Sequence, residues 1–196
     1  VVSEIEAALA DLPLPEGFAI SMGGQNEEMV RSFESMKFAL LLAVFLVYLV
    51  MASQFESLLH PLVIMFTIPL GLIGSALGLL LTDTTVSVVV LIGLIMLAGI
   101  VVNNAIVLVD YINTLRRRDG LPKFEAVTEA GRLRLRPILM TTSTTVLALL
   151  PMAMGVGQGS EIRAPMAITV IGGLLLSTLL TLVVIPMMYT VLERGE

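Results

Sequence analysis

Hydrophobic residues fill five long blocks of the chain that contain no charged side chain, at positions 38–52, 61–82, 86–109, 138–160 and 164–192. A bilayer's hydrocarbon core requires a helix of about 20 apolar residues, and a run of 18 or more indicates a transmembrane helix. Four blocks reach that length. The first block, 38–52, is shorter, but a helical pattern that starts at Asn26 continues into it and lengthens the helix. We therefore predict five transmembrane helices, at about 27–53, 59–82, 86–113, 137–157 and 164–192.

The residues before the first block follow a different pattern. Positions 3–10 have helical spacing, prolines follow at 13 and 15, and the apolar residues alternate over 17–22 as in a strand. A segment this short cannot bury a core of its own. We expect 1–25 to complete a domain that begins upstream and 26–196 to form the transmembrane domain, so that the chain is a piece of a longer protein.

Composition supports a membrane protein and excludes several kinds of site. Hydrophobic residues make up 57% and charged residues 14% of the chain, whereas soluble domains carry about 25% charge. The absence of cysteine excludes disulfides and thiolate metal sites, and a single histidine offers no metal site. No phosphate-binding loop, nucleophile–base pair or dinucleotide fingerprint occurs. We therefore expect no enzyme activity, no cofactor, no bound metal and no nucleic-acid partner.

Basic residues predict the orientation in the membrane. Seven of the 11 Lys and Arg residues lie in the segment 114–136, between the third and fourth spans, and cytoplasmic loops are enriched in such residues. We expect 114–136 to be a basic cytoplasmic loop, containing a short surface helix at 123–133. Five spans then place the N-terminus in the periplasm and the C-terminus in the cytoplasm. The seven residues are Arg116, Arg117, Arg118, Lys123, Arg132, Arg134 and Arg136.

Polar residues inside the third span are candidate functional groups. Asn103 precedes Asp110 by seven residues, so the two share a helix face, whereas Asn104 points about 100° away from Asn103. The alternative interpretation is that these asparagines simply form hydrogen bonds between helices and have no further role. Asp110 can alternatively be an interfacial carboxylate that pairs with Arg116 or Arg117.

The fourth span carries a second polar pattern. Arg134 and Thr141 are seven residues apart and share a face, and five consecutive hydroxyl residues occupy positions 141–145. Arginines near a helix end often reach toward lipid headgroups, and hydroxyls often bond to their own backbone. The combined pattern nevertheless indicates a polar seam along this helix.

Four motifs resemble the resistance-nodulation-division (RND) efflux pumps, and most closely their hydrophobe/amphiphile exporters. They are Gln54-Phe55-Glu56-Ser57, Ile68-Pro69-Leu70-Gly71, the segment 99–110 around Asn103-Asn104, and the segment 134–142 that begins Arg134-Leu135-Arg136-Pro137. Their order and spacing extend the resemblance over essentially the whole chain.

This resemblance implies a fold and a role. The chain would be the C-terminal part of the permease subunit, with spans eight to twelve, and 1–25 would end a ferredoxin-like α+β porter subdomain. The full protein would be a trimeric antiporter of the bacterial inner membrane, which is driven by the proton gradient and exports amphiphilic compounds. Its partners would be a periplasmic adaptor, an outer-membrane channel and membrane lipids.

The resemblance also implies a proton relay. In this family a lysine, an arginine and a threonine complete a relay with an aspartate pair that lies outside this chain. The matching positions are Asn103, Arg134 and Thr141, and Asn103 departs from the lysine because an amide carries no charge.

The sequence is also compatible with three other functions. They are heavy-metal export in the same superfamily, a related protein-translocation accessory, and a membrane scaffold in which polar residues serve only packing.

Overall fold

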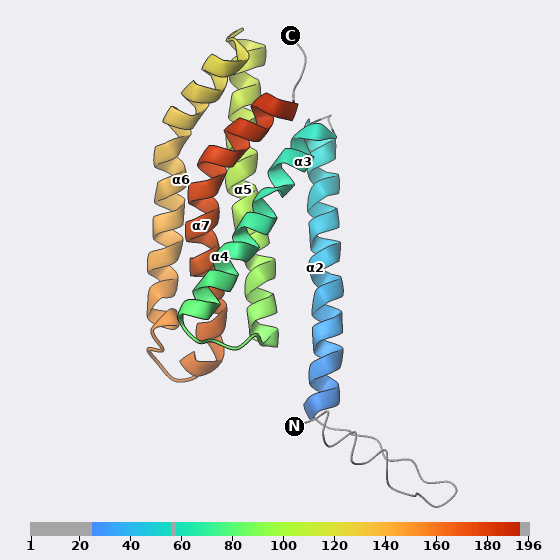
Figure 1. Ribbon diagram of the computed structural model, residues 1–196, viewed down its shortest axis with the longest axis vertical. Coiled ribbons are helices and arrows are strands. Elements are labelled where there is room, and N and C mark those ends of the chain that lie inside the picture. Colours follow the sequence, from blue (N-terminus) through green and yellow to red (C-terminus); the bar gives the residue numbers. More distant parts are fainter. Residues whose placement is uncertain (1–24, 56–57, 193–196) are drawn as a thin grey trace, which may run out of the picture.

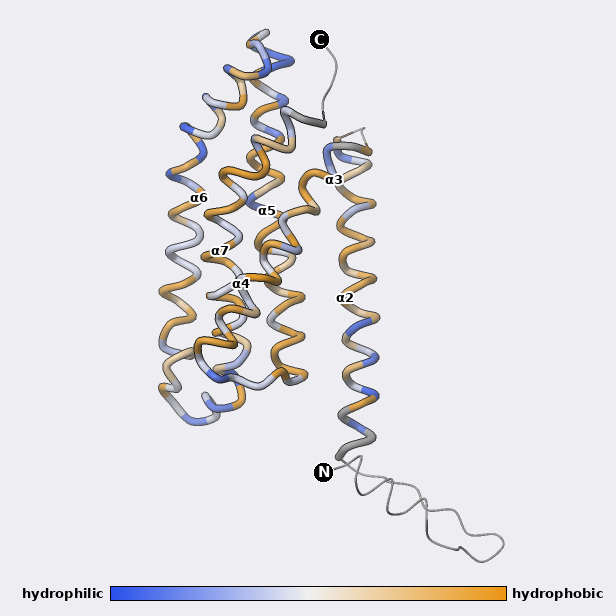
Figure 2. The backbone as a smooth tube through the Cα atoms, in the orientation of Figure 1, coloured by the Kyte–Doolittle hydropathy of each residue, from blue (hydrophilic) through white to orange (hydrophobic). Residues whose placement is uncertain are grey.

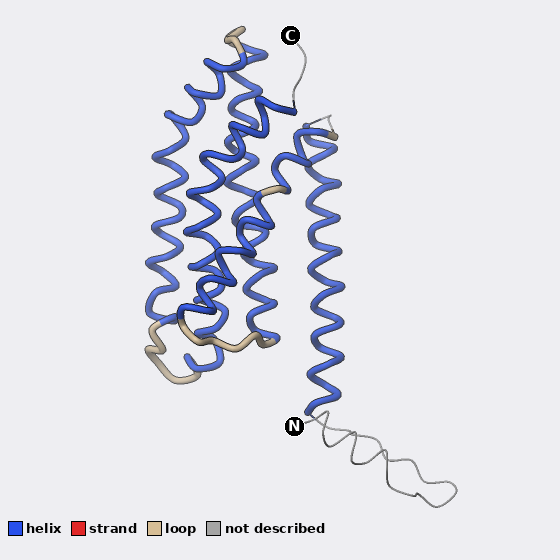
Figure 3. The backbone as a smooth tube through the Cα atoms, in the orientation of Figure 1, coloured by secondary structure: helices blue, strands red, loops and turns tan. Residues whose placement is uncertain are grey.

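The computed structural model describes residues 25–55 and 58–192, and these residues form helices joined by short loops (Figure 3). Five stretches are long and apolar enough to cross a membrane: Val30–Phe55, His60–Leu81, Val88–Arg118, Lys123–Ala153 and Ser160–Thr190. The predicted five-helix membrane fold is therefore confirmed. The predicted helix–strand remnant lies outside the described residues, except for Gln25, which begins the first helix.

The helices are α2 (Gln25–Phe55), α3 (Leu59–Met65), α4 (Thr67–Leu81), α5 (Val88–Arg118), α6 (Lys123–Ala153) and α7 (Ser160–Leu192). Helix α7 packs against α4, α5 and α6, while α2 stands at the side of the bundle and contacts α3 and α5 (Figure 1). The α5–α6 loop and the end of α7 lie at the same end of the bundle, which we call the Arg-rich end. The loops that follow α4 and α6 lie at the opposite end.

Helix length agrees with a transmembrane position. Helices α2, α5 and α6 have 31 residues each, or about 46 Å, whereas the hydrocarbon core is about 30 Å thick. Their ends therefore extend beyond the hydrocarbon. Figure 2 shows hydrophobic residues along the middle of the helices and hydrophilic residues near several of their ends.

Glycines allow α4 and α7 to approach closely. A methyl group added at Gly74 would lie 2.6 Å from the carbonyl oxygen of Gly172, and one added at Gly78 would lie 3.3 Å from the Gly172 Cα. The Ser75 hydroxyl adds an interhelical hydrogen bond to the Thr169 carbonyl, at 2.9 Å. Backbone proximity and this hydrogen bond together hold α7 against α4.

The second span is divided into α3 and α4 at Phe66, three residues before Pro69. Proline lacks an N–H, and its ring clashes with the carbonyl four residues earlier, which here belongs to Met65. The Thr67 hydroxyl donates to the Ile64 carbonyl at 2.6 Å and so satisfies one backbone group at the break. Pro69 therefore accounts for the interruption.

The helix bounds around the predicted basic loop differ from those expected. Helix α5 continues to Arg118 and α6 already begins at Lys123, so only 119–122 lie outside a helix and the expected surface helix is the first part of α6. Helix α6 passes through Pro137 without a break. Its first turns bury Ala126 and Ala130 in a core that also contains Ile112 of α5. This packing accompanies one continuous helix, Lys123–Ala153, in place of the separate short helix expected at 123–133.

Candidate functional site

The polar residues of α5 occupy two different environments. Asn103 and Asp110 are exposed, which agrees with their shared helix face, whereas Asn104 is buried and only 9% exposed. Asp110 forms no ion pair with another described residue, and Arg116 instead donates to the Tyr189 hydroxyl at 3.1 Å. Asn103 and Asp110 therefore mark an open polar face of α5.

Arg134 joins α6 to this part of α5. Its guanidinium carbon lies 4.5 Å from the centre of the Tyr111 ring, a distance at which the ring attracts the cation. Its Nε is buried and has no hydrogen-bond partner among the described residues. A buried N–H of a charged group that lacks an acceptor is costly. Arg134 is therefore a cation that is held in place and has capacity for an anionic partner.

The hydroxyl residues of α6 divide between two roles. Thr141 is exposed and donates to the Ile138 carbonyl at 2.9 Å, and Thr144 and Thr145 likewise bond to their own helix. Thr142 is buried and shares a hydrogen bond of 3.0 Å with Thr178 of α7. Thr142 therefore connects two helices, and Thr141 would have to rotate to donate to any other group.

Antiparallel packing places these residues at two depths. Arg134 on α6 contacts Tyr111 on α5, so these two residues lie at the same depth. Thr141 is seven residues, or about 10.5 Å, further along α6. Because α5 runs in the opposite direction, the residue at the depth of Thr141 is seven residues before Tyr111, which is Asn104. Asn103 and Thr141 thus lie at one depth, and Asp110 and Arg134 lie nearer the Arg-rich end. Among the described parts of the chain, no hydrogen bond joins these four residues to one another. We refer to Asn103, Asp110, Arg134 and Thr141 as the polar seam.

A second polar group at the Arg-rich end was not expected from sequence. Tyr189 of α7 is 1% exposed, and its hydroxyl donates to Asn113 Oδ1 at 2.6 Å while accepting from Arg116. The His60 ring stacks on Tyr189 with ring centres 5.6 Å apart. The only part of this group that the sequence could have indicated is the pair Asn113 and Arg116, which are three residues apart on one helix face. The sequence does not show that α3 and α7 meet them.

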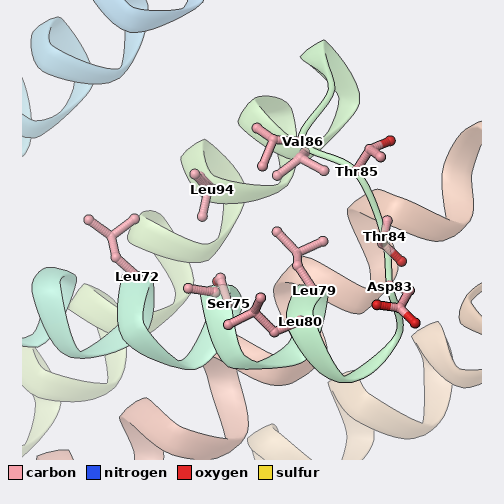
Figure 4. A pocket seen from close by; sticks show the side chains of 11 residues that line it. Leu72, Ser75, Leu79, Leu80, Asp83, Thr84, Thr85, Val86 and Leu94 are labelled. Carbon is pink, nitrogen blue, oxygen red and sulfur yellow. The ribbon is translucent and has the colours of Figure 1, made fainter.

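An apolar cavity lies away from the polar seam, near the opposite end. It has a volume of about 580 Å³ and lies between the end of α4 and the start of α5, with Leu72, Leu79 and Leu94 in its wall and Asp83 on the loop at its edge (Figure 4). Ser75 also lines it, but its hydroxyl is bonded to the Thr169 carbonyl. The lining suits hydrocarbon and offers no set of ion ligands.

Comparisons with known proteins confirm the resemblance seen in the motifs. The model of the AcrB/AcrD/AcrF family matches residues 1–193. The swarming motility protein SwrC of Bacillus subtilis is 42% identical over 99% of this chain and 18% of its own length. The multidrug resistance protein MdtC of Erwinia amylovora is 38% identical over 97% of this chain and 19% of its own length.

Solved structures give the same result. The crystal structure of a heavy metal efflux pump matches with a TM-score of 0.84 and 30% sequence identity, over 99% of this chain and 19% of that one. The chain thus spans about a fifth of the length of the relatives it matches.

Proposed function

Because this chain belongs to the AcrB/AcrD/AcrF family of RND permeases, we propose that it forms part of the membrane domain of a proton-driven exporter of amphiphilic compounds. The observation that carries this proposal is Arg134, whose buried Nε has no partner among the described residues and which lies beside the exposed face of Asn103 and Asp110. Polar and charged groups at membrane depth are costly and usually mark ion or substrate pathways.

In this proposal the polar seam faces acidic groups in another part of the full-length protein. Arg134 stabilises a carboxylate in its ionised form, and protonation of that carboxylate weakens the interaction. Asn103 donates a hydrogen bond through its amide but carries no charge, so Arg134 is the cation of the relay. Thr141 contributes after its hydroxyl turns away from the Ile138 carbonyl. Loss and recovery of these contacts would couple proton passage to helix movement.

The two remaining candidates have distinct roles. Asn104, which is buried, supports the packing of α5 and so fixes the direction in which Asn103 points. Asp110, which is exposed on the same face as Asn103, supplies a carboxylate between the seam and the Arg-rich end. It lies where a proton would leave the seam.

We also propose an orientation and an assembly. The Arg-rich end faces the cytoplasm because basic residues concentrate in cytoplasmic segments, so the N-terminus is periplasmic and the C-terminus cytoplasmic. The full-length protein resides in the bacterial inner membrane as a homotrimer. In cells with an outer membrane, it works with a periplasmic adaptor and an outer-membrane channel.

Amphiphilic compounds are the proposed substrates, with metal ions as the competing class. Identity to MdtC is 38%, against 30% for the heavy metal efflux pump. Among the residues described, no three or more His, Asp or Glu side chains gather as a group that could hold a metal ion. The heavy metal pump is nevertheless a close structural neighbour, so the test must include a metal ion.

The test compares Arg134→Ala with Arg136→Ala in the full-length protein, reconstituted in liposomes with an imposed pH gradient. Transport of a lipophilic cationic dye and proton flux are both measured. We expect Arg134→Ala to lose about tenfold or more of coupled transport, since a charged hydrogen-bond partner is removed. Arg136, which is exposed two residues away, serves as the matched control and should retain transport.

Two results would contradict parts of the proposal. Equal transport by both variants would remove Arg134 from the relay. Transport of copper(I) or zinc ions, without dye, by the wild-type protein would assign it to the metal exporters.

A further inference from the structure

A polar cavity at the Arg-rich end carries a further inference. It has a volume of about 360 Å³ and lies where α3, the end of α5, the α5–α6 loop and the start of α6 meet. Its lining is mostly polar, in contrast to the cavity near Asp83. The described residues that line it are His60, Asn113, Arg116, Arg117, Leu121, Pro122 and Lys123.

Tyr189 of α7 organises the wall of this cavity. It is 1% exposed, so its ring has a fixed position, and its hydroxyl accepts from Arg116 Nη1 and donates to Asn113 Oδ1. The guanidinium carbon of Arg116 lies 5.9 Å from the Tyr189 ring centre, and the His60 ring stacks on the same ring. Lys123 is held to α7 by a bond of 2.7 Å to the Thr190 carbonyl. Arg116 and Lys123 are thus positioned by contacts with α7.

The described residues that line the cavity include several basic side chains. Arg116, Arg117 and Lys123 are cationic, and no Asp or Glu is among the described residues that line the cavity. Asp119 and Glu125 are close in sequence but do not line it. Arg117 is exposed, and neither it nor the Asn113 amide nitrogen bonds to another described residue. Arg117 and the Asn113 amide therefore present N–H donors to an anion.

We propose that this cavity binds a phosphate group, and that its source is the headgroup of an anionic phospholipid. A phosphate presents several acceptor oxygens to the Arg and Lys donors. Basic pockets at the cytoplasmic ends of transmembrane helices recognise such headgroups. The ends of α5 and α6 extend beyond the hydrocarbon core, which places the cavity at headgroup depth. Phe124, beside Lys123, is 77% exposed and supplies an apolar contact at the same level.

Only the assignment to the cytoplasmic leaflet rests on the orientation proposed above. Binding itself requires neither transport nor a particular orientation. The experiment therefore measures lipid binding in the absence of any gradient, so that its failure is distinct from a failure of the transport proposal.

The experiment titrates phosphatidylglycerol onto the full-length protein in detergent and follows bound lipid by native mass spectrometry. The test variants are Arg117→Gln and Lys123→Gln. Arg118→Gln is the matched control, because it removes the same charge from the next residue, which does not line the cavity. We expect each test variant to weaken binding of the tightest phosphatidylglycerol about tenfold and the control to bind as the wild type does. Melting temperatures verify that all variants are folded.

Competition identifies the source of the phosphate group. If the lipid stays bound in excess inorganic phosphate, the cavity is a headgroup site. If inorganic phosphate displaces the lipid from the wild type, and no such displacement occurs in Arg117→Gln, the cavity is a site for the free anion. Equal binding of phosphatidylglycerol by wild type, Arg117→Gln and Lys123→Gln would overturn the proposal. Equal affinity of the wild type for phosphatidylcholine would overturn the selectivity for anionic lipid.

Discussion

Asn103 and Asn104 show how adjacent residues of one type take different roles. One helical step turns the side chain by about 100°, and this step separates an exposed amide from one that is only 9% exposed. Asn104 faces the interior of the bundle with Val101 and Leu108, which are also buried. An exposed amide at mid-span satisfies its hydrogen-bonding groups only against another polar surface. This difference is the residue-scale reason to assign the relay role to Asn103.

The first prediction follows from this assignment. Asn103→Leu in the full-length protein should abolish drug resistance in cells while leaving expression and trimer formation intact, because it removes hydrogen bonds without burying a new charge. Met96→Leu is the control, since Met96 is also exposed on α5 and receives the same residue. Drug susceptibility and crosslinked trimer yield provide the measurements. Resistance at the wild-type level in Asn103→Leu would reduce Asn103 to a packing contact.

At the scale of the helices, the contact between α4 and α7 depends on the absence of side chains. Gly74 and Gly172 have no room for a methyl group, since each added Cβ would lie 2.6–2.8 Å from the carbonyl oxygen of the other. Gly99 on α5 has open space around it. The same substitution should therefore have opposite consequences at the two positions.

We expect Gly74→Ala to destabilise the full-length protein by about 1–3 kcal/mol, the usual cost of overpacking. Gly99→Ala should be neutral or slightly stabilising, because alanine favours the helix more than glycine does and the added methyl group meets no described atom. Thermal unfolding in detergent measures the difference. Equal melting temperatures for the two variants would show that α4 and α7 can separate without cost.

Sequence alone predicted the membrane spans well, because apolar runs longer than a bilayer leave few alternatives. It failed at the α5–α6 connection, where a basic loop with a separate short helix at 123–133 was expected over 114–136, whereas α5 continues to Arg118 and α6 begins at Lys123. The burial of Ala126 and Ala130 against Ile112, which keeps this segment helical, is a tertiary contact without a local signature. The Tyr189 network was missed for the same reason, since its members come from α3, α5 and α7. Polar residues within single spans were visible, but their partners were not.

At the scale of the whole molecule, the two ends of the bundle differ in charge. The Arg-rich end carries Arg116, Arg117 and Arg118 and the basic cavity, whereas the loop after α4 contains Asp83 and the apolar cavity lies beside it. Positive charge is retained in the cytoplasm during insertion. The proposed orientation and the assignment of the lipid site to the cytoplasmic leaflet both depend on this asymmetry.

The last prediction tests that orientation. The chain contains no cysteine, so single cysteines can be introduced without background from this segment, in a full-length protein whose other cysteines are removed. Asp119→Cys lies in the α5–α6 loop, and Glu161→Cys is exposed at the start of α7 at the opposite end. A membrane-impermeant maleimide added to intact cells should label position 161 and spare position 119, and permeabilisation should make both reactive. Labelling of 119 in intact cells, with 161 protected, would reverse the orientation and move the phosphate-binding cavity to the outer leaflet.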